Sequence, residues 1–80
     1  MKLPRDIDGI KLAKALAGFG CQITRQTGSH IRLTTSERGE HHITIPAHNP
    51  LKIGTLSAIL SDIESHFKLT RDELLKRLFP

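Results

Sequence analysis

Histidine is the residue type in this chain best suited to chemistry near neutral pH, and its five copies are unevenly placed. Four of them, His30, His41, His42 and His48, lie between positions 30 and 48, and His66 lies apart. An unperturbed imidazole titrates at about pH 6.5, so a positioned histidine can take up or release a proton during a reaction. This segment is therefore the first candidate for a site of acid–base chemistry.

Apolar and polar residues alternate around these histidines, which predicts β-strands. Turn-forming residues at Thr27-Gly28 and over 36–40 divide the alternating stretch. The sequence therefore predicts a three-stranded antiparallel meander, with strands that start at Cys21, His30 and His42. Its aliphatic positions, Ile31, Leu33, Ile43 and Ile45, would face a core, so the even-numbered positions, His30, Arg32, Thr34, His42 and Thr44, would occupy the solvated face.

A symmetric second turn would set the two histidines of greatest interest close together. His30 would face Pro46 across the sheet, and His48 would lie one diagonal step further, within roughly 7–8 Å of His30. After Pro46, a second helix opens at Gly54-Thr55, and its unpaired N–H groups, with Lys52, would form an anion site suited to a phosphate.

A phosphate site beside two histidines suggests cleavage of a phosphodiester. RNA carries its own nucleophile, the 2′-OH, so a general base, a general acid and charge stabilisation suffice, with no metal ion or cofactor. A metal centre is not favoured, because His42 points away from His41 and no carboxylate is placed beside His30.

Helical patterns flank the strands and complete an α+β fold in one domain, residues 1–80. Asp8 can cap a first helix that runs to about Leu16 or Ala17 and ends at Gly18 and Gly20. A capping box at 70–73 starts a short C-terminal helix. The apolar faces expected for the three helices are Ile10, Ala13, Leu16 and Ala17; Leu56, Ile59, Leu60 and Ile63; and Leu74, Leu75 and Leu78.

Composition limits the classes of function. Eighty residues with a net charge of +4 make one small basic domain, which favours an anionic partner. The single Cys21 excludes a disulfide scaffold, and the chain shows no signal peptide and no membrane-spanning run, so we expect a cytoplasmic protein without a membrane partner. Without Trp or Tyr, RNA contacts would depend on charge and hydrogen bonds.

Several of the residues singled out also have a simpler, purely structural interpretation. A solvent-facing strand histidine is usually an ordinary surface residue, and we interpret His41 and His42 in that way. Cys21 is best explained as a small buried residue and Gly28 as a turn glycine. Lys11 and Lys14 fit a solvated helix face.

The segments Arg25-Gln26-Thr27-Gly28-Ser29-His30, Ile45-Pro46-Ala47-His48 and Gly54-Thr55-Leu56 together resemble the HicA toxin family of bacterial HicAB toxin–antitoxin modules. The resemblance covers nearly the whole chain, including Leu3-Pro4-Arg5. It implies a double-stranded-RNA-binding-like fold and an mRNA interferase, an endoribonuclease that cuts mRNA until a cognate HicB antitoxin blocks it.

The same resemblance implies roles for individual residues. His30 occupies the functional position of the Gly-Ser-His motif and His48 that of Pro-x-His, so both are candidate catalytic residues. Arg25 is carried over as an RNA contact, with Gly28 as its motif neighbour and Ser29 as a supporting donor. The RNA-binding set is Arg25, Gly28, Ser29, Arg32, Lys52, Gly54 and Thr55. Ser57 departs from the family, in which a basic residue commonly follows Gly-Thr-Leu.

Two other functions remain open from the sequence. The chain could be a non-catalytic module that holds duplex RNA, although its basic residues are scattered. It could also act chiefly as a protein-interaction partner, with carboxylates of an acidic protein placed against Arg25 and Arg32.

Overall fold

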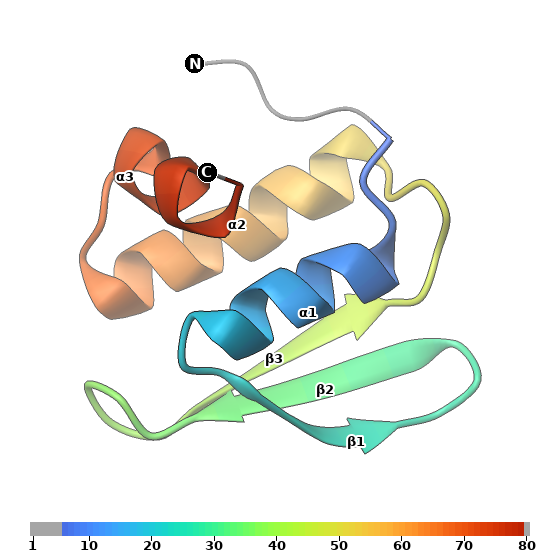
Figure 1. The fold of residues 1–80 in the computed structure, drawn as a ribbon, viewed down its shortest axis with the longest axis horizontal. Helices are drawn as coiled ribbons and strands as arrows, with labels where there is room; N and C mark the ends of the chain where they lie inside the picture. Colours follow the sequence, from blue (N-terminus) through green and yellow to red (C-terminus); the bar gives the residue numbers. More distant parts are fainter. Residues whose placement is uncertain (1–5, 80) are drawn as a thin grey trace.

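The computed structural model describes residues 6–79, which form α1 (Gly9–Gly18), β1 (Gln22–Gln26), β2 (His30–Thr35), β3 (His41–Pro46), α2 (Ile53–Phe67) and α3 (Arg71–Leu78). The strands make one antiparallel sheet in the order β1-β2-β3, and the helices lie together on one side of it (Figure 1). The expected α+β class and order of elements are confirmed. We call the side of the sheet away from the helices its outer face. The Leu3-Pro4-Arg5 segment of the resemblance lies outside the described residues.

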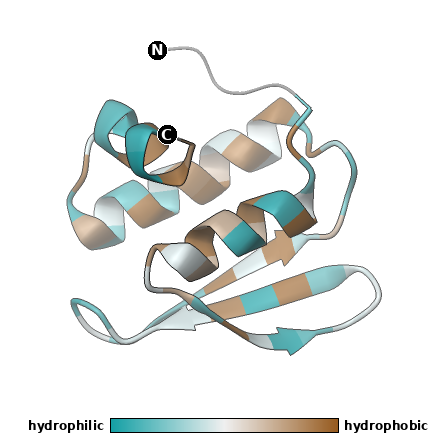
Figure 2. Cartoon of the chain, viewed as in Figure 1, coloured by the Kyte–Doolittle hydropathy of each residue, from teal (hydrophilic) through white to brown (hydrophobic). Residues whose placement is uncertain are grey.

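The register between β2 and β3 is the one that a symmetric turn predicts. The paired residues are His30 with Pro46, Arg32 with Thr44, and Thr34 with His42. The aliphatic residues between them are at most 3% exposed: Ile31, Leu33, Ile43 and Ile45. Figure 2 shows the resulting alternation of hydrophobic and hydrophilic positions along β2. The even-numbered residues therefore lie on the outer face, as expected.

The register between β1 and β2 is interrupted by a β-bulge at Thr24, which differs from the strict alternation expected for this strand. Ile23 pairs with Leu33, but the next pair is Arg25 with Arg32. Strict alternation would turn Arg25 toward the helices, because Ile23 faces that way. The extra residue puts Thr24 and Arg25 on the outer face together, and so brings Arg25 beside Arg32.

The start of α1 follows the prediction, but its buried face does not. The Asp8 carboxylate accepts a hydrogen bond from Lys11 N at 2.6 Å, which confirms the cap. The buried residues of the helix are Gly9, Leu12, Ala13 and Leu16, whereas Ile10 and Ala17 are exposed. Gly9 explains the difference, since a β-carbon there would lie 1.9 Å from the Pro46 carbonyl oxygen. Because the helix touches the end of β3 at this glycine, the face that carries it is turned inward.

The ends of α1 and α2 also differ slightly from expectation. Gly18 is the last residue of α1 rather than a stop, and Gly20, with φ +108°, makes the left-handed turn that follows. The second helix begins at Ile53 with Lys52 as its N-cap, one residue before the predicted Gly54-Thr55 start. Gly54 and Thr55 nevertheless remain in its first turn.

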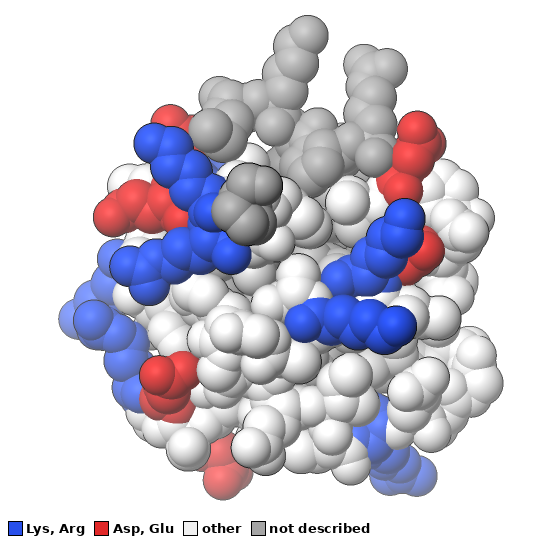
Figure 3. All heavy atoms as spheres, in the orientation of Figure 1, with Lys and Arg blue, Asp and Glu red and all other residues white. Residues whose placement is uncertain are grey.

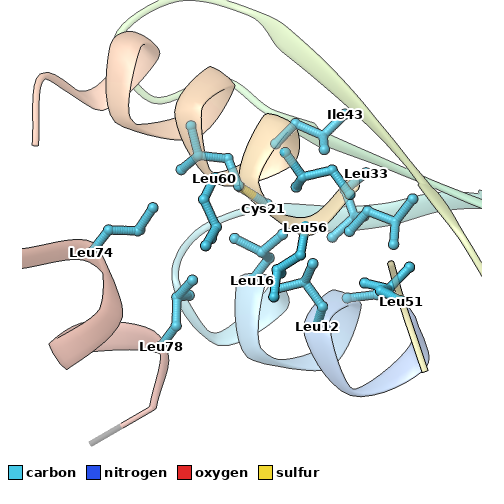
Figure 4. Close-up of a cluster of buried hydrophobic side chains, with 14 of the residues drawn as sticks. Leu12, Leu16, Cys21, Leu33, Ile43, Leu51, Leu56, Leu60, Leu74 and Leu78 are labelled. Atoms are coloured by element: carbon cyan, nitrogen blue, oxygen red, sulfur yellow. The ribbon is translucent and has the colours of Figure 1, made fainter. Parts of the chain in front are cut away.

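The core lies between the sheet and the helices and is built almost entirely from aliphatic side chains (Figure 4). The predicted stripe of α2 is buried and is extended by Phe67, and α3 buries its three predicted leucines. Cys21 is fully buried in this cluster, and burial, followed by the nearby Glu37 charge, raises the pKa of its thiol. The expectation that Cys21 is a small buried residue is thus confirmed, and its raised pKa keeps it protonated and unreactive.

The last helix is held by the predicted capping box. The Thr70 hydroxyl accepts from Glu73 N at 3.2 Å, and the Glu73 carboxylate accepts from Thr70 N at 2.9 Å. The backbone N–H of Thr70 lowers the pKa of Glu73. An Arg71–Glu64 ion pair joins α3 to α2.

None of the helices in residues 6–79 is long and apolar enough to cross a lipid bilayer.

Candidate active site

His30 is held at the first position of β2 by a tight turn. Thr27 N donates to the His30 carbonyl at 2.9 Å, and His30 N donates to the Thr27 hydroxyl at 3.2 Å. The imidazole itself is exposed. Its backbone is therefore fixed from both sides while its ring is available to a substrate on the outer face.

The ring of His30 is oriented by its neighbour. Ser29 Oγ lies 3.0 Å from His30 Nδ1, and this contact leaves Nε2 as the nitrogen that can meet a substrate. When Nδ1 carries the proton and donates to the hydroxyl, Nε2 has the lone pair of a general base. When the hydroxyl donates to Nδ1 instead, Nε2 carries the proton of a general acid. Ser29 can support either state of the imidazole.

Gly28 lies in this turn between β1 and β2, as predicted. Its φ does not lie in the left-handed region that glycine favours. An added β-carbon at this position would meet no heavy atom within 4 Å. The fold therefore does not require glycine here, and its missing side chain leaves open space beside His30.

His48 lies just beyond β3, in the loop that leads to α2. Ala47 N donates to the Ser29 carbonyl at 2.9 Å, so the pairing of β2 and β3 continues for one residue past Pro46 in the same register. The His48 carbonyl then accepts from Gly9 N at 2.9 Å, which ties this loop to the start of α1. The His48 side chain is exposed.

The first turn of α2 presents backbone donors at the same end of the molecule. Lys52 is its N-cap and no side chain caps the helix. The first helical donor is Leu56 N, which bonds to the Lys52 carbonyl at 2.9 Å, so the N–H groups of Ile53, Gly54 and Thr55 precede the helical ladder. Figure 1 shows this helix start, the β1–β2 turn and the end of β3 at one end of the fold.

The two arginines of the candidate site form a pair on the outer face. Arg25 pairs in register with Arg32, both are exposed, and Arg32 is two residues from His30 along β2. Neither takes part in an ion pair within residues 6–79. Two guanidinium groups without a protein carboxylate are suited to the phosphates of a nucleic acid.

Two of the other histidines, His41 and His66, have structural contacts. His41 Nε2 lies 2.9 Å from an Asp62 carboxylate oxygen, and its ring stacks on His66 with 4.4 Å between centroids. His66 Nε2 donates to the Glu37 carbonyl at 2.9 Å. These contacts attach the β2–β3 hairpin to α2.

Within residues 6–79, no three His, Cys, Asp or Glu side chains are grouped so that they could hold a metal ion.

A family model described as HicA toxin of bacterial toxin-antitoxin matches residues 9–64, which is more than half of the chain. The chain belongs to the HicA toxin family. No curated protein and no solved structure matches it. The matched segment of this HicA-family toxin runs from the first residue of α1 into the last turns of α2, and so contains His30, His48 and the arginine pair. A toxin of this kind has a cognate antitoxin as its partner.

Proposed function

We propose that this HicA-family toxin is an mRNA interferase, an endoribonuclease that cleaves single-stranded mRNA in the cytoplasm without a metal ion and so inhibits translation and growth. The observation that carries the proposal is the exposed His30 imidazole, oriented through Nδ1 by Ser29, at the end of the fold where α2 begins.

The chemistry needs only groups that these residues can supply. A general base takes the proton of the ribose 2′-OH, the 2′ oxygen attacks the adjacent phosphorus, and the 5′ oxygen leaves with a proton from a general acid. The products are a 2′,3′-cyclic phosphate and a 5′-OH. We assign His30 to one of the two proton transfers and His48 as the candidate for the other.

Charge stabilisation at the phosphate is assigned to the surrounding donors. The N–H groups of Gly54 and Thr55, with Lys52, would bind the phosphate oxygens as negative charge develops in the transition state. Arg25 and Arg32 would hold the neighbouring phosphates of the strand. Ser57 leaves this toxin without the basic side chain common after Gly-Thr-Leu, so more of the phosphate binding falls to the backbone N–H groups.

We further infer that a HicB-type antitoxin inhibits the toxin by covering the outer face near His30. The free guanidinium groups of Arg25 and Arg32 are suited to carboxylates of such an inhibitor. The alternative of a duplex-RNA-binding module is less well supported, because the Lys and Arg side chains on the face of the molecule seen in Figure 3 are scattered and form no single basic patch there.

The direct test is incubation of the purified protein with a defined single-stranded RNA in excess chelator. Cleavage is expected to proceed at the same rate as in magnesium buffer, because the proton transfers and the charge stabilisation all come from the protein. Products would be separated on a denaturing gel and their ends identified by mass. Activity that disappears in chelator and returns with magnesium would refute the histidine mechanism.

A further inference from the structure

A chain of hydrogen bonds crosses all three strands on the outer face, beyond the arginine pair. Thr24 Oγ1 lies 3.0 Å from Thr34 Oγ1, and Thr34 Oγ1 lies 2.9 Å from His42 Nδ1. His42 Nε2 in turn lies 3.3 Å from a Glu40 carboxylate oxygen. The proposed cleavage reaction uses none of these side chains. Exposed polar side chains usually keep their rotamer freedom and lose it when a ligand binds. Here the hydrogen bonds already restrict the side chains, so their polar atoms are held in fixed positions before a ligand binds.

The surface beside this chain of bonds is hollowed. A cavity of about 220 Å³ is lined by Gly20, Gln22, Thr24, Thr34 and Ser36. Its lining combines polar and apolar atoms, and none of its five lining residues is charged. Hydroxyl and amide groups both donate and accept hydrogen bonds, which fits the edge of a base or the hydroxyls of a ribose. A phosphate would instead favour a cationic lining.

The hollow lies in line with the proposed site of cleavage. His30, Arg32 and Thr34 are alternate residues of β2 on the outer face, so Thr34 is about 13 Å from His30 along the strand. Arg32 and its partner Arg25 stand between them. A single RNA strand could lie along β2 with its cleaved phosphate at His30. The strand would then cross the two arginines and place a nucleotide close to the cleaved bond at the hollow.

We propose that this hollow is a nucleotide-recognition subsite, which takes a base of the single-stranded RNA at a position flanking the cleaved bond. The inference rests on the proposed function, since it requires RNA along β2. A site of fixed hydrogen-bonding groups discriminates strongly, because a nucleotide that cannot pair with them leaves desolvated polar atoms without partners. The hollow would therefore give the toxin a sequence preference that the arginines cannot supply, because phosphate contacts carry no sequence information.

Thr34→Val tests the subsite, because valine has nearly the same shape and suits a strand but lacks the hydroxyl that joins Thr24 to His42. The measurement is the rate of cleavage at each position of a randomised single-stranded RNA, read by sequencing the product ends. We expect the wild-type protein to prefer one nucleotide at a fixed distance from the cut. In Thr34→Val that preference should fall about tenfold, the effect of one or two lost hydrogen bonds, with an unchanged rate at the poorest sites.

Thr44→Val is the matched control, because Thr44 lies exposed on the same face, opposite Arg32, and outside the chain of bonds. It should keep the wild-type preference. A Thr34→Val protein with the wild-type cleavage profile would overturn the subsite and leave the proposed function standing. A wild-type protein that cleaves without preference, or an equal loss in both variants, would overturn the subsite as well. A wild-type protein that cleaves no RNA would overturn both proposals.

Discussion

Replacing His30 with alanine is expected to lower the rate of RNA cleavage by about 10²- to 10⁴-fold, the usual effect of losing a positioned general acid or base. This corresponds to roughly 3–5 kcal/mol of activation free energy. The fold should be unaffected, because the imidazole is exposed and its only side-chain hydrogen bond within residues 6–79 is with Ser29. The measurement is the single-turnover rate on a defined RNA in chelator, with thermal unfolding as the check on stability.

Gln26→Ala is a suitable control for His30→Ala. Gln26 is exposed and ends the other strand of the same hairpin, but it pairs with Ile31, which faces the core side of the sheet. Its loss should leave the rate close to that of the wild-type protein. A His30→Ala protein that cleaves within a few-fold of the wild-type rate would remove His30 from the mechanism, whatever the behaviour of the control.

The double variant Arg25→Ala/Arg32→Ala is expected to weaken the binding of single-stranded RNA by about 100-fold at low salt, from two lost charge-assisted hydrogen bonds. The dependence of log K on log salt should also become shallower, by about 0.7 for each phosphate contact removed. Fluorescence anisotropy with a 2′-O-methyl RNA, which cannot be cleaved through its 2′ oxygen, measures both quantities without interference from the reaction.

Lys11→Ala/Lys14→Ala removes the same number of charges from the outward side of α1 and serves as the control for the arginine pair. Both lysines are exposed. If binding depends on the arginines beside His30, the lysine variant should retain most of its affinity and nearly the full salt dependence. Equal losses in the two double variants would show that net charge, and not the Arg25–Arg32 pair, governs RNA binding.

Features that depend on local sequence were predictable. The register that pairs His30 with Pro46 follows from the length of the 36–40 turn, because alternation and a symmetric turn leave one pairing that buries the aliphatic residues. The cap at Asp8 and the capping box at 70–73 each involve atoms only three residues apart. The position of His30 on the outer face could therefore be inferred before the structure was known.

Features that depend on distant contacts were not predictable in the same way. The buried face of α1 is decided by the approach of Gly9 to the Pro46 carbonyl, and the periodicity of the helix alone does not contain that contact. The bulge at Thr24 has a weak sequence signal, because the run of polar residues from Thr24 to Thr27 after Ile23 also fits the end of a strand. Yet this bulge places Arg25 beside Arg32 on the outer face, whereas strict alternation after Ile23 would turn it toward the helices.

The central claim is that histidine chemistry activates the 2′-OH of the RNA, and the most direct measurement changes the substrate. A defined RNA that carries one 2′-deoxynucleotide immediately before the preferred cut would be incubated with the wild-type protein in chelator. We predict that cleavage stops at that bond alone and continues elsewhere with 2′,3′-cyclic phosphate ends. Unchanged cleavage at the deoxy position would contradict the claim.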